Sequence, residues 1–159
     1  MTRLNFYAIA PAAVEPLTKV AADLEKVGLD MTLTELVKLR ASQINGCANC
    51  LHMHMADTLK NGERPERIVL LDAWRESRMY SPRERAALAW TEALTRVAET
   101  GAPDVDFAAM KAEFTDEQIV HLTMLIAAIN AWNRIAIGFR AQNPNDTRLA
   151  RELAQDQAA

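Results

Sequence analysis

TLTELVKLRASQINGCANCLHMHMADTLKN, residues 32–61, contains both cysteines of the chain and two of its three histidines. The residues on either side of Asn45-Gly46 have the apolar spacing of helices. Asn and Gly tolerate the left-handed backbone that closes a helix, so this pair predicts a stop between two helices. We therefore expect a helical hairpin that carries Cys47-x-x-Cys50 at the start of its second helix.

The remainder of the chain also has helical periodicity and no convincing strand pattern. Residues 12–27 predict a first helix, and Ser81-Pro82-Arg83-Glu84 and Thr115 with Gln118 have the spacing of helix caps. Thr32 and Glu35 have the same spacing. We predict one all-α domain over residues 1–159, compact and multi-helical, with six to eight helices and a core at about 12–140.

The composition is that of an ordinary globular protein, with 50% hydrophobic and 25% charged residues and a net charge of −3. No block of like charge is present, so nothing indicates nucleic acid as a partner. Residues 119–139 are long and apolar, but His121, Asn130 and Arg134 within them favour a buried core helix over a membrane span. Two cysteines and no convincing signal peptide predict a cytoplasmic protein, in which thiols stay reduced unless they work in catalysis.

Cys47, Cys50 and His54 are three and four positions apart, so on a helix they share one face. Cα atoms at this spacing fall within the ~4.4–6.8 Å that a disulfide requires, so the pair can cycle between dithiol and disulfide. The start of a helix also favours a thiolate, most of all at Cys47. His54, one turn after Cys50, can accept its proton.

Glu35 precedes Gly46 by eleven residues and His54 follows it by eight. If the chain turns back at Gly46, the two side chains stand at similar heights on adjoining helices. The carboxylate would then orient the imidazole and raise its basicity. A simpler reading is that Glu35 serves only as the capping residue that pairs with Thr32.

Other readings of the motif remain open at this level. The two thiols could be merely buried, or they could bind zinc with His54 and a fourth ligand such as His52 or Glu35. A c-type haem attachment requires CxxCH, and Leu51 separates Cys50 from His52 here. His52 lies on a different helix face from His54, so we expect it to be exposed or at an interface.

The spacing of Glu35, Cys47, Cys50 and His54 resembles the signature of the alkylhydroperoxidase D-like branch of the carboxymuconolactone decarboxylase superfamily. The stretches AWRESRMYSPRERAALAWTEALT and AAINAWNRIAIGFR also resemble its small single-domain members, so the likeness extends over about residues 12–140. The resemblance implies a helical fold, a trimeric or hexameric homo-oligomer, and thiol chemistry without a cofactor or metal. Asn49 stands where the best-known members have a further histidine.

Carried over by residue, the resemblance implies that Cys50 meets a hydroperoxide and becomes a sulfenic acid, which Cys47 converts to a disulfide. His54 would be the base on Cys50, and Glu35 would complete the proton relay. A lipoyl-protein or a small dithiol would then reopen the disulfide. We therefore expect a thiol-dependent peroxidase. The alternatives are a lactone enzyme of the decarboxylase type, whose members generally lack the CxxC pair, and a dithiol stress sensor without turnover.

Overall fold

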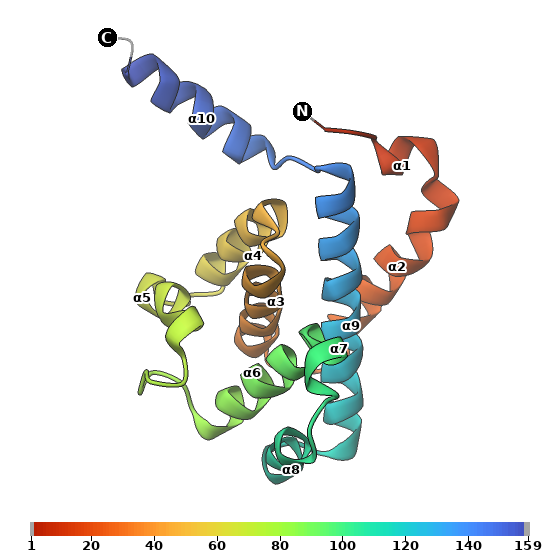
Figure 1. Ribbon diagram of the computed structural model, residues 1–159, viewed down its shortest axis with the longest axis vertical. Helices are drawn as coiled ribbons and strands as arrows, with labels where there is room; N and C mark the ends of the chain where they lie inside the picture. The colour runs from red at the N-terminus through yellow and green to blue at the C-terminus, as the bar shows by residue number, and fades with distance from the viewer. Residues whose placement is uncertain (1, 158–159) are drawn as a thin grey trace.

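The computed structural model describes residues 2–157, and every regular element within them is a helix. In chain order these elements are α1 (Phe6–Ile9), α2 (Pro11–Leu24), α3 (Met31–Asn45), α4 (Ala48–Lys60), α5 (Pro65–Val69), the 3-10 helix η1 (Leu70–Ala73), α6 (Pro82–Thr95), α7 (Val97–Thr100), α8 (Asp104–Glu113), α9 (Asp116–Phe139) and α10 (Pro144–Asp156). Figure 1 shows α9 spanning the body of the molecule, with the α3–α4 pair on one side of it and α1–α2 on the other. The predicted all-α class is confirmed.

The predicted hairpin is formed by α3 and α4, and Gly46 joins them. Gly46 has φ 69° and ψ 35°, a left-handed backbone that glycine adopts at little cost. Its amide donates to the carbonyl of Gln43 at 3.2 Å, and the amide of Cys47 donates to the carbonyl of Ser42 at 3.0 Å. This pair of bonds is a Schellman motif, which satisfies the last carbonyls of α3. The same turn leaves Cys47 as the residue that caps α4.

The predicted cap of Thr32 and Glu35 is wrong. The α3 helix begins one residue earlier, at Met31, and Asp30 caps it by accepting a 2.8 Å hydrogen bond from the amide of Leu33. Asp30 caps the helix in place of Thr32 because its short carboxylate lies beside the free amides of the first turn. Glu35 therefore belongs to the second turn and is buried.

The long helix α9 begins at the predicted capping box of Thr115 and Gln118 and packs against α2, α3, α4, α6 and α8. Its buried side chains join those of α3 and α6 in the main core, which includes Val37, Trp90, Leu122 and Ile126. By length and composition α9 could also cross a membrane, with a mean hydropathy of 1.3. Its packing on five neighbouring helices agrees with the predicted core helix instead, while a cytoplasmic location stays a prediction.

Several boundaries differ from those that periodicity predicts. Residues 65–73 change from an α-helix to a 3-10 helix at Leu70. The helix that begins at Pro82 ends at Thr95, and α7 follows it after Arg96 and ends at Thr100. The described residues therefore contain ten α-helices and one 3-10 helix, more than the six to eight expected. The added elements are short, and the N-terminal α1 is one of them.

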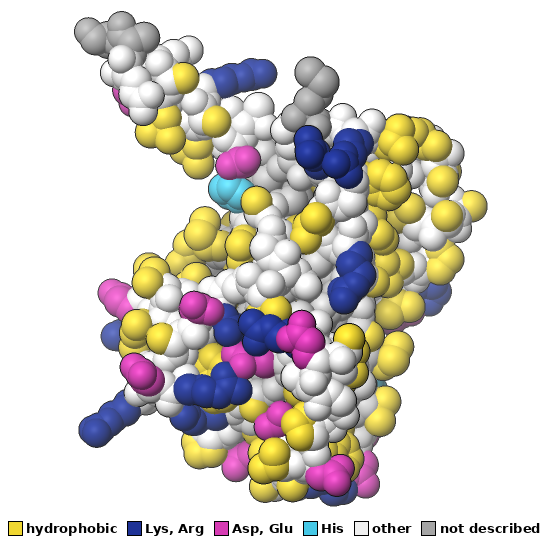
Figure 2. All heavy atoms as spheres, in the orientation of Figure 1, with side chains coloured by type: hydrophobic (Ala, Val, Ile, Leu, Met, Phe, Trp, Pro, Cys, Tyr) yellow, Lys and Arg dark blue, Asp and Glu magenta, His cyan; other side chains and the backbone are white. Residues whose placement is uncertain are grey.

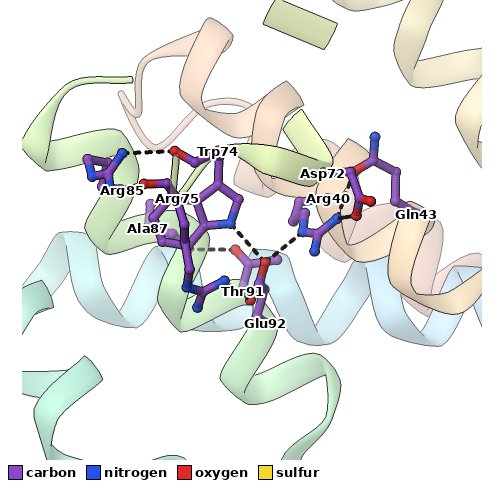
Figure 3. A network of polar contacts seen from close by, with 9 residues as sticks. All are labelled: Arg40, Gln43, Asp72, Trp74, Arg75, Arg85, Ala87, Thr91 and Glu92. Atoms are coloured by element: carbon purple, nitrogen blue, oxygen red, sulfur yellow. Dashed lines mark hydrogen bonds and ion pairs between the residues drawn. The ribbon is translucent and has the colours of Figure 1, made fainter. Parts of the chain in front are cut away.

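The segment from η1 to Trp74 is fastened to α3 and α6 by buried charge (Figure 3). Glu92 on α6 accepts hydrogen bonds from Arg40 Nε and Trp74 Nε1, each at 2.8 Å, and also pairs with Arg75. Arg40 further binds Asp72 and Gln43. We call these residues the Arg40–Glu92 cluster. It replaces hydration of the buried Arg40 and Glu92 with ion pairs and hydrogen bonds.

The C-terminal segment forms a helix, α10, which projects from the body next to the end of α9 (Figure 1). None of its residues is buried, and Leu149 and Leu153 are exposed. Figure 2 shows hydrophobic side chains along one side of this helix. This helix lies beyond the predicted core of about residues 12–140.

Candidate functional site

The two cysteines lie at the junction of α3 and α4. They form a disulfide, with Cα atoms 5.4 Å apart, inside the range predicted from their spacing. Cys47 Sγ also accepts a 3.4 Å hydrogen bond from the amide of Cys50, in the manner of a helix cap. Both residues are buried, Cys47 at 1% and Cys50 at 4% exposure, and Ala136 of α9 packs on them. Cys47 is therefore at the helix start, as expected, and it is the less exposed of the two residues.

Glu35 and His54 are in direct contact across the hairpin. Glu35 Oε2 lies 2.9 Å from His54 Nδ1, and both side chains are buried. An ionised carboxylate can only accept, so Nδ1 carries the proton in this hydrogen bond. In the neutral imidazole, Nε2 then has a free lone pair. This is the arrangement expected of a histidine that is to act as a base.

Lys38 completes this group, and sequence reasoning missed it. Its Nζ lies 2.8 Å from Glu35 Oε1, so each oxygen of the carboxylate has its own donor. Burial raises the pKa of Glu35, but the hydrogen bonds from His54 and Lys38 outweigh burial and hold that pKa below its usual value. Glu35 therefore stays ionised. The i, i+3 spacing of Glu35 and Lys38 on one helix was the available signal.

Asn45 has a second role that the sequence does not reveal. Its Nδ2 donates to Asn130 Oδ1 at 2.9 Å and to Asn133 Oδ1 at 2.8 Å, both on α9. Asn133 in turn donates to Ser42 Oγ at 3.1 Å. These amides fasten the end of α3 to α9 directly before the cysteines. The partners lie 85 and 88 residues away in the chain, so local patterns give no signal for them.

A cavity of about 700 Å³ opens over one of the two cysteines. Cys50 and His54 line it, together with Lys38, whereas Cys47 is not among its lining residues. Most of the remaining wall is apolar and includes Phe6, Tyr7, Met53, Leu125, Ile129 and Trp132. A small molecule in this cavity would therefore contact both Cys50 and His54.

The two neighbouring polar residues of the motif take different places. His52 Nε2 lies 3.1 Å from Asp146 Oδ1 on α10, so it faces away from His54. Asn49 lines the cavity and its Nδ2 lies 3.8 Å from Met53 Sδ, a long and weak contact. His52 therefore serves the packing of α10, and Asn49 offers an amide at the cavity wall in place of an imidazole.

The alternative zinc set of Cys47, Cys50, His54 and a fourth ligand is not gathered. Among residues 2–157 the group with ligand atoms close enough for a metal is Glu35, His54 and Asp57, within 4.8 Å of one another, and it includes neither cysteine. The Lys38 ammonium on Glu35 would repel a cation there. These residues fit a proton relay better than a metal site.

Comparison with known proteins gives the family. The sequence model of the carboxymuconolactone decarboxylase family matches residues 11–93. The uncharacterized protein YdfG of Bacillus subtilis is 40% identical over 139 residues, which cover 85% of this chain and 92% of that protein.

Solved structures agree with this result. An Agrobacterium tumefaciens protein of unknown function, suggested to be the antioxidant defence protein AhpD, is 45% identical, with a TM-score of 0.88 over 91% of this chain and 99% of that one. A peroxidase-related protein with an AhpD core from Ralstonia eutropha JMP134 has a TM-score of 0.76 over 87% and 75% of the two chains, and at 21% identity it shows the shared fold. The chain belongs to the carboxymuconolactone decarboxylase family, among its alkylhydroperoxidase D-like members.

Proposed function

We propose that the protein is a thiol-dependent peroxidase in which Cys50 reduces a hydroperoxide. His54 Nε2 takes the proton of the Cys50 thiol, and the thiolate attacks the terminal peroxide oxygen. The O–O bond breaks, the alcohol leaves with a proton from the imidazolium, and Cys50 becomes a sulfenic acid. Cys47 then attacks the Cys50 sulfur, which forms the disulfide and releases water. A dithiol returns two electrons and two protons to close the cycle.

The observation that carries the proposal is the shared cavity of Cys50 and His54, with Cys47 placed behind them at disulfide distance. A base must lie within reach of the proton it takes, and the resolving thiol must reach the oxidised sulfur without unfolding the helix. Glu35 and Lys38 support the role of His54, since they fix which ring nitrogen carries the proton.

The reductant, the location and the oligomeric state are part of the same proposal. The reductant is a lipoyl-protein or a small dithiol, and the protein acts in the cytoplasm as a trimeric or hexameric homo-oligomer. The exposed Leu149 and Leu153 of α10 support self-association, because a second copy would cover them. Light scattering on the purified protein will test the oligomer, and a mass equal to one chain of 17.7 kDa contradicts it.

A peroxidase assay with organic hydroperoxides and several dithiol reductants tests the reaction. We expect Cys50→Ser to abolish turnover. We expect Cys47→Ser to leave a sulfenic acid at Cys50 that a dimedone probe traps. Ala48→Ser, at an exposed position between the two cysteines, is the matched control and should turn over normally.

Three outcomes separate the alternatives. Two free thiols that persist after peroxide treatment contradict all redox roles and leave the lactone-enzyme alternative. Disulfide formation without catalytic turnover under any reductant identifies a dithiol sensor. A dimedone adduct at Cys47 in the Cys50→Ser variant would mean that Cys47 reacts with the peroxide and Cys50 then forms the disulfide.

A further inference from the structure

The cavity over Cys50 has walls of two different origins. Lys38, Cys50, Met53 and His54 belong to the part of the chain that matches the family model, residues 11–93. The facing wall comes from the N-terminal residues Thr2–Tyr7 and from α9, both outside that part. The reacting groups are thus in the family region, while much of the surface that a substrate would contact is not.

The N-terminal wall is fixed to the end of α9. The amide of Arg3 donates to the carbonyl of Phe139 at 2.9 Å, and its guanidinium donates to the carbonyl of Gly138 at 3.0 Å. The ring of Phe6 lies 5.6 Å from that of Phe139, and the ring of Tyr7 stacks on Trp132 at 6.2 Å and 29°. Such ring distances are those of favourable aromatic pairs. The wall is therefore built into the fold.

Size and charge limit what this cavity suits. A volume of about 700 Å³ with aromatic walls is typical of a site for a drug-sized apolar molecule and far exceeds hydrogen peroxide. The lining residues carry two carboxylates, those of Glu25 and Asp57, while the one lysine among them is already paired with Glu35. An anionic substrate would therefore meet uncompensated negative charge.

We propose that this aromatic wall makes the site selective for neutral, bulky, apolar hydroperoxides, with Tyr7 and Trp132 as the specificity-determining residues. The proposal rests on the peroxidase function, and it names the substrate class of that site. Hydrogen peroxide and ionised fatty-acid hydroperoxides are then poorer substrates, the first because it leaves the apolar wall unused and the second because of its charge.

The test compares kcat/KM for cumene hydroperoxide, hydrogen peroxide and linoleic acid hydroperoxide. We expect cumene hydroperoxide to be preferred. Tyr7→Ala and Trp132→Ala should each lower the ratio of cumene hydroperoxide to hydrogen peroxide by about tenfold, as expected for loss of an aromatic contact. Phe107→Ala on α8, outside the cavity lining, is the control and should leave the ratio unchanged. Tyr7 is exposed, so its variant tests the wall even if Trp132→Ala does not fold.

An unchanged ratio in folded Tyr7→Ala overturns the proposal, as does a wild-type preference for hydrogen peroxide or linoleic acid hydroperoxide. Binding of cumyl alcohol, followed by NMR on the full chain, separates the two proposals. Saturable binding that Tyr7→Ala weakens, with no turnover of any peroxide, upholds the apolar binding wall but refutes the peroxidase function. Turnover of hydroperoxides with no binding of cumyl alcohol and no preference among the three substrates upholds the peroxidase function and refutes the selectivity.

Discussion

The α3 helix carries two buried charge clusters that look alike and differ in one respect. The Arg40–Glu92 cluster joins α3 to α6, and Lys38, Glu35 and His54 join it to α4. Burial raises the pKa of Glu92 in the first cluster and of Glu35 in the second, but hydrogen bonds outweigh burial, so both pKa values lie below the ordinary range. Only the second cluster contains a residue that lines the cavity beside Cys50. A lowered pKa is therefore common to structural and candidate catalytic groups here, and access to the reacting sulfur distinguishes them.

The largest effect on activity should come from His54→Gln. Glutamine can still donate to Glu35 but cannot take the proton of Cys50, so kcat/KM should fall about 10²–10⁴-fold. Stopped-flow peroxide consumption measures this. His52→Gln, a histidine bound to α10 instead, is the control. A His54→Gln variant with the wild-type rate would remove the base from the mechanism.

Glu92→Gln should instead act on stability. It removes the charge that compensates the buried Arg40, so the free energy of unfolding should fall by about 3 kcal/mol and Tm by roughly 6–12 °C. Glu92 is not among the residues that line the cavity, so the rate per folded chain should not change. Urea unfolding with activity measured at a permissive temperature separates the two effects.

The pH dependence gives this prediction a sign. The pKa of Glu92 in the folded protein is lower than in the unfolded chain. Its contribution to the free energy of unfolding is therefore fully present above about pH 4.5 and is lost as the pH falls through the folded-state pKa. The gap in stability between wild type and Glu92→Gln should therefore close on acidification below 4.5. A gap that persists there would mean that packing, and not charge, accounts for it.

Glu35→Gln should lower kcat/KM by about 10–100-fold, the usual cost of losing the carboxylate that orients a working histidine. An amide at this place can donate as well as accept, so it no longer fixes the proton on Nδ1. NMR of the His54 ring nitrogens reports the change directly. Glu15→Gln, exposed on α2, is the matched control, and an equal loss there would show a nonspecific effect.

The smallest effect should come from Lys38→Met. Removing this ammonium raises the pKa of Glu35, since the hydrogen bond and charge that lower it are lost. Activity that requires ionised Glu35 should then fade at a higher pH on acidification than in the wild type. Lys38→Arg should restore the wild-type profile, whereas Lys60→Met, at an exposed site, should not alter it. A profile that does not move would limit Lys38 to packing.

The hairpin, the long helix and the contact of Glu35 with His54 could be predicted because local signals determine them. Helical periodicity, the Asn45-Gly46 stop and the Thr115 cap each act within a few residues. The Thr32 cap failed for a local reason as well, because Asp30 competes for the same amides and is better placed. The 3-10 turn at Leu70 had no such signal, and it lies where Asp72 and Trp74 reach the Arg40–Glu92 cluster.

The parts that could not be predicted join distant segments. Asn45 meets Asn130 and Asn133 only because α9 packs on α3. The N-terminal wall reaches the cavity only because Arg3 binds the last turn of α9. One sequence contains no pattern that pairs residues so far apart. The candidate residues Glu35, Cys47, Cys50 and His54 could therefore be named from the sequence, whereas Lys38 and most of the cavity were not.

The burial of Cys47 limits how the oxidised protein can be reduced. Cys47 is 1% exposed and absent from the cavity wall, so an incoming thiolate meets the sulfur of Cys50. Attack there releases Cys47 and leaves the mixed disulfide on Cys50. Under the proposed function, the electron donor must therefore present its thiolate to Cys50 through the cavity, as a small dithiol or a dithiol on a flexible arm can do.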